Sequence, residues 1–323
     1  MTNNIIRYHW IDNIKAFALY LVVLGHIGSS SLHHIIYGFH MPLFFLLSGM
    51  LHKDKPVADM FKRLVIPYIL FNIIYLALES PWLYRQYGNV DFLLRDVRGI
   101  VYPTEHPIDY PTWFLLSLFE IKLIVKGLRD NIRLAFAISV VLIAICCILD
   151  INHDGPFFIK NTLIGLSYYC MGHLLYHVFT SNINAEKRYV VCISGGGKKI
   201  IVLYLIAMMQ FDSCVWNESM KQPMQFVYSI IGCLGMLLLF KGCFNLHSAI
   251  LEKCSIGAVA IIGLHPLLIQ YCRRAVVLMG GSWGDYPVMI DMLIAAIVML
   301  LCMLTIPFVI KYFPLLIGLK RKV

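Results

Sequence analysis

The sequence predicts an all-α, polytopic membrane protein with about ten transmembrane helices and cytoplasmic N- and C-termini. Three observations support this fold class. Of the 323 residues, 59% are hydrophobic and 14% are charged, and the mean hydropathy is +0.75, a balance typical of membrane proteins rather than soluble domains. Apolar stretches close to the roughly 20 residues that cross a bilayer recur along the chain. The basic residues also concentrate in alternate connecting segments.

Ten apolar stretches are the expected spans. They cover residues 11–28, 34–51, 64–78, 111–126, 134–150, 157–177, 189–211, 224–241, 255–272 and 287–310. The seventh contains Gly195 to Lys199, so the true span is expected to be shorter and to begin near Ile200. The N-terminal residues lack the short apolar core and cleavage site of a removable signal peptide, so the first stretch is expected to stay as a span. Without repeats or an appended soluble domain, we expect one membrane domain over residues 1–323.

The distribution of basic residues predicts the orientation, because cytoplasmic segments carry the excess of Lys and Arg. With the N-terminus inside, all but seven of the 27 basic residues fall in cytoplasmic segments. The seven on the outside are Arg85, Arg95, Arg98, Lys160, Lys221, Arg273 and Arg274. The formal charge of +9 then follows from membrane topology. No nucleic-acid partner is expected, because such binding requires a basic face on a soluble module.

Residues 79–110 form the longest expected outer connection. They include aromatic side chains and the polar residues Glu79, Asp91, Asp96, Glu105, His106 and Asp109. Long connections without regular elements are often binding loops or lids, and we expect that role here.

The first apolar stretch carries or adjoins three ionisable residues, Asp12, Lys15 and His26. Ionisable groups in a membrane are costly and indicate a functional site by default. At 100° and 1.5 Å per residue, Lys15 and His26 lie about 20° apart around the helix and about 16 Å apart along it. Asp12 lies three residues before Lys15, close enough to pair with it. The alternative is that Asp12 and Lys15 snorkel to the interface and that His26 only packs.

The second apolar stretch contains His40, Pro42, Ser48 and Gly49. Pro42 removes a backbone donor and can kink a helix, while Ser48 and Gly49 permit close approach of a neighbouring helix. His40 is expected to face His26, in a polar site or in simple packing. Two histidines do not make a zinc site. Seven of the ten cysteines fall within apolar runs without metal-type spacing and are interpreted as buried hydrophobes: Cys146, Cys147, Cys170, Cys192, Cys233, Cys272 and Cys302. No metal is predicted.

Several of these residues together resemble the signature of acyltransferase family 3. The matching features are Lys15 and His26 separated by ten residues, Asp12 before Lys15, and the string Phe45-Leu-Leu-Ser48-Gly49. The longer string FHMPLFFLLSG, with Lys15 where other members carry arginine, is similar to the fucose 4-O-acetylase-like branch of the family.

Three later strings extend the resemblance over nearly the whole chain. They are Arg63-Leu-Val-Ile-Pro67-Tyr68, Trp113-Phe114-Leu115 and Gly263-Leu-His265-Pro266. The single Arg63 behind Lys62 departs from the family pattern, because many members have two spaced arginines in this segment.

The resemblance implies a ten-helix membrane enzyme that uses cytoplasmic acyl-CoA. His26 would be the essential histidine, acting as general base toward an acceptor hydroxyl or as a transient acyl carrier, roles that suit an imidazole with a pKa of about 6.5. Lys15 and Arg63 would contact donor phosphates. Asp12 would position Lys15.

The resemblance also implies roles for the remaining motif residues. Phe45, Ser48 and Gly49 would pack beside the acyl channel, with Ser48 as an acylated nucleophile the alternative. His265 would orient His26 or the acceptor, or else be a structural histidine bonded to a backbone carbonyl freed by Pro266. Trp113 would be an interfacial anchor or a platform for a sugar ring. The other histidines noted, interpreted as structural or interfacial, are His33, His34, His173, His177 and His247.

The sequence therefore predicts an acyl-CoA-dependent O-acyltransferase of a bacterial cytoplasmic (inner) membrane. Acetyl-CoA would be the donor, and the acceptor a hydroxyl of a cell-surface polysaccharide or of a lipid-linked sugar precursor. The alternatives are a succinyl or N-acyl transferase of the same fold, or a glycan or lipid transporter, since His and Lys within helices also mark transport paths. Membrane lipid is a further expected partner. Direct transfer and an acyl-enzyme are both compatible with the sequence, as are several oligomeric states and acceptor sugars.

Overall fold

The computed structural model describes residues 7–28, 32–103, 110–149, 156–180, 196–205, 223–283 and 287–319. All regular elements in these ranges are helical, which confirms the all-α class. The α-helices are α1 (His9–Gly25), α2 (His33–Tyr37), α3 (His40–Met50), α4 (Val57–Tyr87), α5 (Asp91–Val101), α6 (Trp113–Gly127), α7 (Ile132–Ile148), α8 (Ile159–Thr180), α10 (Pro223–Cys243), α11 (Ala249–Ile256), α12 (Ala258–Leu278) and α13 (Val288–Tyr312). Three 3₁₀ segments are η1 (Tyr110–Thr112), η2 (Pro156–Phe158) and η4 (Pro314–Ile317).

Within the described residues, four helices are long and apolar enough to cross a membrane. They are Val57–Tyr87, Phe226–Cys243, Ala258–Leu278 and Val288–Tyr312, and the shorter helices Ile35–Met50 and Ile132–Ile148 are also apolar. These helices characterise a multi-pass membrane protein. The total of about ten spans and the cytoplasmic location of both termini stay predictions.

The seventh expected span differs from its prediction at its start. Residues 196–205 are helical, so this helix includes residues before Ile200. The glycines and lysines that suggested a later start are therefore partly incorporated into the helix. The rest of the 189–211 stretch lies outside the described residues.

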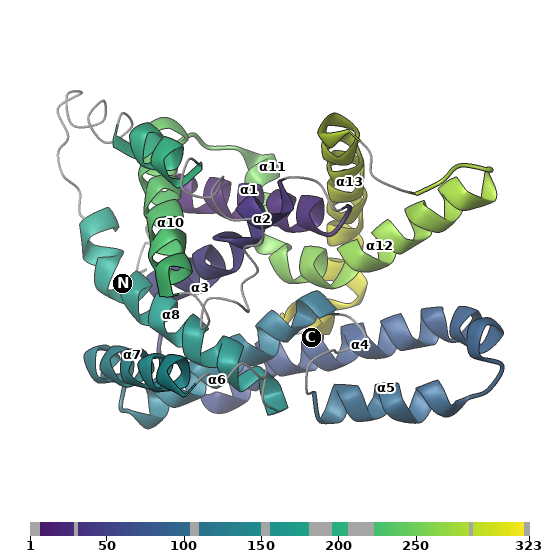
Figure 1. Ribbon diagram of the computed structural model, residues 1–323, viewed down its shortest axis with the longest axis horizontal. Coiled ribbons are helices and arrows are strands. Elements are labelled where there is room, and N and C mark those ends of the chain that lie inside the picture. Colours follow the sequence, from purple (N-terminus) through teal and green to yellow (C-terminus); the bar gives the residue numbers. More distant parts are fainter. Residues whose placement is uncertain are drawn as a thin grey trace.

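Helix α1 lies between α10 and α13 in the upper half of the view (Figure 1). It contacts α2, α3, α10, α11, α12 and α13, and the side chains of Ile14, Leu19 and Val23 are completely buried. Helices α4, α5, α6 and α7 occupy the opposite side of the molecule from α11 and α13. Polar residues of α1 therefore face protein rather than lipid, as functional groups within a membrane generally do.

The described part of the 79–110 connection is mostly helical, so the irregular loop expected there is a wrong prediction. Helix α4 continues through Pro81 to Tyr87 and ends at Gly88, whose φ of 69° is the left-handed conformation that commonly ends helices. Helix α5 follows. Residues 104–109 lie outside the described residues.

A buried ion pair explains why α4 continues beyond the apolar stretch. The carboxylate of Glu79, which is 2% exposed, accepts hydrogen bonds from both terminal nitrogens of Arg274 in α12. Gln270 donates to the same carboxylate at 3.2 Å. The paired charges attach α4 to α12 and offset the cost of burying each other.

Helices α3 and α8 cross with their backbones in direct contact at two glycines. A β-carbon added to Gly49 would lie 1.8 Å from the carbonyl oxygen of Tyr169, and one added to Gly172 would lie 1.9 Å from that of Leu46. Any side chain at either position would force the helices apart, so only glycine fits. The crossing gives Gly49 a specific neighbour, helix α8.

Replacing Gly49 with alanine should destabilise the protein. The added methyl group overlaps backbone atoms that cannot rotate away, so we expect a loss of about 1–3 kcal/mol or more. The measurement is the midpoint of thermal unfolding of the purified protein in detergent. Gly127→Ala is the matched control, because nothing lies within 4 Å of the added atom, and its midpoint should not fall. An unchanged midpoint for Gly49→Ala would contradict the close crossing.

Candidate active site

His26 is the residue that caps the C-terminal end of α1, with φ −95° and ψ −3°. Its Nδ1 lies 2.7 Å from the carbonyl oxygen of Val22. Because a carbonyl only accepts hydrogen bonds, Nδ1 carries the proton and donates it. Nε2 is then a lone-pair acceptor, which is the form that a general base or nucleophile requires. The residue as a whole is partly accessible, although the last turn of α1 before it is buried.

Tyr37 of α2 links His26 to two further histidines. Its hydroxyl lies 3.4 Å from His26 Nε2, and its ring stacks on His33 with 3.9 Å between centroids and meets the edge of His40 at 4.8 Å. His40 is 2% exposed, and its Nδ1 donates to the carbonyl oxygen of Ile36 at 2.8 Å. The structure thus places His40 in the same cluster as His26, with Tyr37 between them.

His265 of α12 completes this histidine cluster. Its ring centroid lies 5.0 Å from that of His26, in an edge-on orientation. The side chain is completely buried, and Nδ1 donates to the carbonyl oxygen of Ile261 at 2.8 Å. The accepting carbonyl is that of Ile261 and not that of Ile262, which Pro266 leaves without its helical donor, so the structural role expected from the sequence is met by a neighbouring carbonyl. The bond occupies one edge of the ring only. Among the described residues, no group of three or more His, Cys, Asp or Glu is arranged to hold a metal ion.

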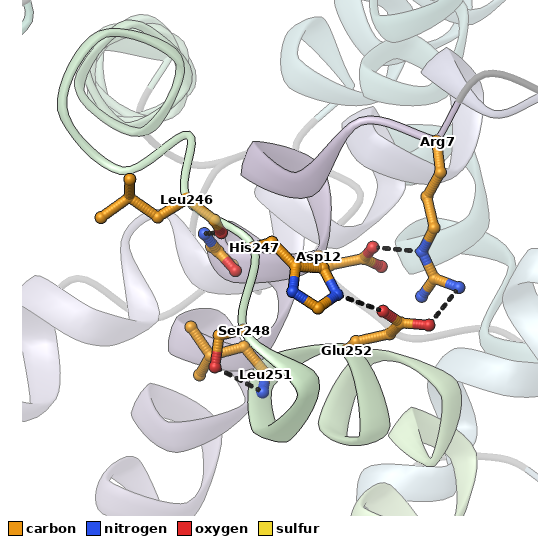
Figure 2. Close-up of polar contacts among 8 residues, drawn as sticks. Arg7, Asp12, Leu246, His247, Ser248, Leu251 and Glu252 are labelled. Carbon is orange, nitrogen blue, oxygen red and sulfur yellow. Dashed lines mark hydrogen bonds and ion pairs between the residues drawn. The ribbon is translucent and has the colours of Figure 1, made fainter.

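The other end of α1 is held by a network of ion pairs (Figure 2). Arg7 Nε lies 2.7 Å from Asp12 Oδ2, and Arg7 Nη1 lies 2.8 Å from Glu252 Oε1. His247 Nε2 lies 3.4 Å from the same glutamate. The expected ion pair between Asp12 and Lys15 is therefore replaced, because Arg7 precedes the helix and reaches the carboxylate from outside it.

Lys15 lies about one turn further into α1 and is partly accessible. The charges of Asp12 and Arg7 both act on its ammonium group, but no carboxylate of the described residues lies within 4.0 Å of it. The adjacent Asn13 donates to two backbone carbonyls between α10 and α11, at 2.6 and 2.8 Å, and so fixes α1 there. A cation in this position is suited to an anionic ligand.

Arg63 belongs to a separate group of cations. It is exposed near the start of α4, and it acts electrostatically on Lys55, as Lys53 does. Lys55 in turn acts on Lys122 of α6. Among the polar contacts of the described residues, none joins Arg63 to α1. The two expected donor contacts, Lys15 and Arg63, therefore belong to different clusters.

Phe45 and Trp113 lie together in an aromatic cluster. The centroid of the completely buried Phe45 ring lies 4.8 Å from that of Phe114 and 6.2 Å from that of Trp113. Trp113 is 5% exposed, which leaves little surface for a sugar ring. Ser48 is partly exposed and lies about 12 Å along α3 from His40, eight residues earlier. This separation disfavours Ser48 as a nucleophile at the histidine cluster.

A second polar cluster lies at the C-terminal end of α3. The hydroxyl of Tyr169 is hydrogen-bonded to His52 Nδ1 at 2.6 Å, and Lys122 Nζ donates to the same hydroxyl at 3.1 Å. His52 Nε2 lies 3.7 Å from Asp130 Oδ1. Sequence reasoning assigned no joint role to these residues, because they are far apart in the chain and form no motif.

The pH dependence of stability should report on His52. Burial lowers the pKa of His52, and the charges of Lys122 and His173 act in the same direction, against those of Asp130 and Asp54. In the unfolded chain the imidazole has a pKa of about 6.5 and binds a proton more readily, so stability falls as the pH drops below that value. We expect His52→Gln to reduce the fall in thermal unfolding midpoint between about pH 7.5 and about pH 5.5.

The control for this measurement is His177→Gln, which changes an exposed histidine of α8. That variant should lose as much stability on acidification as the wild-type protein. An equal loss in wild type and His52→Gln would show that protonation of His52 does not control acid stability.

Three residues near the histidine cluster were not found from the sequence: Tyr37, Trp283 and Asp291. Trp283 Nε1 donates to the carbonyl oxygen of Ile27 at 3.2 Å. Asp291 is 2% exposed, and its Oδ2 would lie 3.2 Å from a β-carbon added to Gly28. An acid within an apolar stretch was a usable signal for Asp291, whereas Tyr37 and Trp283 had none.

The helices and the histidine cluster together make this a multi-pass membrane protein with imidazole acceptors packed between its helices, and such acceptors are suited to group transfer. A family model described as an acyltransferase domain, Acyltransferase 3, matches residues 8–312. The chain belongs to acyltransferase family 3 and is a membrane acyltransferase, which confirms the resemblance of the sequence motifs. The match is to the family as a whole and does not confirm membership of the fucose 4-O-acetylase-like branch. No curated protein and no solved structure matches the chain.

Proposed function

We propose that the protein moves an acetyl group from cytoplasmic acetyl-CoA to a hydroxyl of a cell-surface polysaccharide or of a lipid-linked sugar precursor. The observation that carries this proposal is the tautomer of His26, that is, which of its ring nitrogens carries the proton, in a domain of this family. Its Nδ1 donates to the carbonyl oxygen of Val22, which leaves a lone pair on Nε2 of a partly accessible residue inside the protein. Transfer of an acyl group to a hydroxyl requires a base or nucleophile of this kind.

Two routes can use the Nε2 lone pair of His26. In direct transfer, Nε2 takes the proton of the acceptor hydroxyl while its oxygen attacks the thioester carbonyl carbon; the C–S bond breaks, and the CoA thiolate takes up that proton. In the alternative, Nε2 attacks the carbonyl first and CoA leaves. The oxygen of the hydroxyl then attacks the acyl carbon, the bond from that carbon to Nε2 breaks, and the proton of the hydroxyl passes to the CoA thiolate.

The donor is proposed to bind along α1. Lys15 offers a cation about 16 Å along the helix from His26, and CoA carries its phosphates and its thioester at opposite ends of a long pantetheine arm. Phosphates held near Lys15 would therefore let the thioester reach His26. Asp12, which forms an ion pair with Arg7, would affect the electrostatic potential around Lys15 without pairing with it. Arg63 and its neighbouring lysines would contact the distant, nucleotide end of the donor.

The acceptor is proposed to approach the other end of α1. The positive-inside pattern supports an outer location for that end, and the membrane is proposed to be a bacterial cytoplasmic membrane. Phe45, Ser48 and Gly49 would pack α3 beside the acyl path, and His40 would hold Tyr37 in place. Mass analysis of the modified glycan distinguishes an acetyl from a succinyl group.

The first test is release of CoA from acetyl-CoA by the detergent-purified protein. His26→Ala removes the lone pair and should lower the rate by about 10²-fold or more. Lys15→Gln removes a donor contact, so it should raise the KM for acetyl-CoA about 10-fold, equivalent to about 1.4 kcal/mol, with little change in kcat.

Arg133→Gln, which removes an exposed cation near the start of α7, is the control and should behave as wild type. Full activity of His26→Ala would overturn the assigned chemistry. Absence of CoA release by wild type, even with native membranes as a source of acceptor, would overturn the acetyl-CoA proposal itself.

The contribution of Arg63 should depend on salt. Exposed charges are screened as ionic strength rises, so the KM of the wild type for acetyl-CoA should increase with salt. Arg63→Gln should have a higher KM at low salt and a smaller salt dependence, whereas Arg63→Lys should keep most of both. Identical salt dependence in wild type and Arg63→Gln would place Arg63 outside the donor site.

A further inference from the structure

His265 carries a buried hydrogen-bond acceptor that no described group satisfies. The side chain has no exposed surface, Nδ1 donates to Ile261, and Nε2 has no partner. A buried acceptor without a donor costs free energy, and such groups are rare in native structures unless they have a function. The natural ligand of this nitrogen is therefore a group that donates a hydrogen bond.

His26 presents a second acceptor of the same kind close by. The two rings lie 5.0 Å apart, and in both the Nδ1 proton is committed to a carbonyl. Their Nε2 atoms therefore cannot bond to each other. The hydroxyl of Tyr37 approaches His26 Nε2 only to 3.4 Å, which is long for a hydrogen bond, so a closer donor can replace it.

The chemistry of the two substrates decides which of them this pair binds. The oxygen and sulfur of a thioester only accept hydrogen bonds, so the reacting end of the acyl donor cannot satisfy either imidazole. A hydroxyl donates one hydrogen bond. Two imidazole acceptors side by side match two neighbouring hydroxyls, which is the arrangement of a vicinal diol on a sugar ring.

Two more side chains lie at the same end of α1. Trp283, fixed by its bond to Ile27, is partly exposed and offers a flat apolar surface for the C–H groups of a sugar. The buried carboxylate of Asp291 lies against Gly28 and can accept hydrogen bonds from hydroxyls. An aromatic surface with a few convergent polar groups is typical of small-molecule sites.

We propose that His265, Trp283 and Asp291 form the acceptor subsite and select a vicinal diol of a sugar ring. His265 Nε2 accepts a hydrogen bond from one hydroxyl, and the neighbouring hydroxyl is presented to His26 Nε2. The oxygen of that neighbour forms the new ester bond to the acetyl carbon, its proton passes to His26, and the breaking C–S bond releases CoA, which takes up the proton. This inference rests on the proposed function.

A matched pair of substitutions at residue 265 tests the subsite. Asparagine can replace the Nδ1 bond to Ile261 but does not reach the position of Nε2, whereas glutamine does and offers an acceptor oxygen there. Membranes from host cells that produce each variant contain the natural acceptor. The assay gives them radiolabelled acetyl-CoA and measures label in the glycan or lipid-linked fraction.

We expect His265→Asn to lower the initial rate of label transfer about 10-fold or more. The KM for acetyl-CoA and the thermal unfolding midpoint should stay close to wild type. His265→Gln should restore most of the rate, His177→Asn should have no effect, and Trp283→Ala should lower the rate as His265→Asn does. A purely structural role for His265 would instead lower the unfolding midpoint and disturb donor kinetics.

Three outcomes would overturn the subsite: undiminished transfer by His265→Asn, equal losses in the asparagine and glutamine variants, or a loss that appears in the KM for acetyl-CoA. NMR of the labelled product tests the diol directly, because the carbon next to the new ester should carry a free hydroxyl. An ester on a hydroxyl whose neighbouring carbons carry no other hydroxyl would exclude the vicinal diol as the acceptor. If wild-type membranes transfer no label, the proposed function fails. If wild-type membranes transfer label and His265→Asn membranes transfer it equally fast, only the acceptor subsite fails.

Discussion

The arrangement of the histidine cluster depends on one hydrogen bond that occurs three times, from an imidazole Nδ1 to the backbone carbonyl one helical turn earlier. The pairs are His26 with Val22, His40 with Ile36, and His265 with Ile261. Each bond fixes which nitrogen carries the proton and which keeps the lone pair. Because the rings are packed among helices, the backbone rather than water determines this choice. The cluster consequently consists of acceptors before any substrate binds.

Much of the fold was predictable, because a long apolar segment in a bilayer has few alternatives to a helix. The last three expected spans lie close to α10, α12 and α13. The extent of α4 was not predictable in the same way. It continues because Glu79 pairs with Arg274, a residue 195 positions away, and neither local hydropathy nor Pro81 contains that information.

The candidate site, like the fold, was predictable from the sequence only in part. The spacing of Lys15 and His26 required only the helical repeat, and the family motifs pointed to His265. The partners of these residues come from tertiary packing instead: Arg7 rather than Lys15 pairs with Asp12, and Tyr37 stands between His26 and His40. Local spacing identifies which groups share a helix face, but the choice among possible partners depends on helices that meet only in the folded protein.

The reciprocal glycine contact between α3 and α8 also constrains biogenesis. Gly49 and Gly172 each lie under a carbonyl of the other helix, and the described residues between α3 and α8 include four α-helices, α4 to α7, which are synthesised first. During insertion, α3 therefore waits with its small-residue face uncovered until α8 has left the ribosome. Lipid or an insertion chaperone must cover that face in the interval, so the order of synthesis makes this crossing one of the later contacts to form.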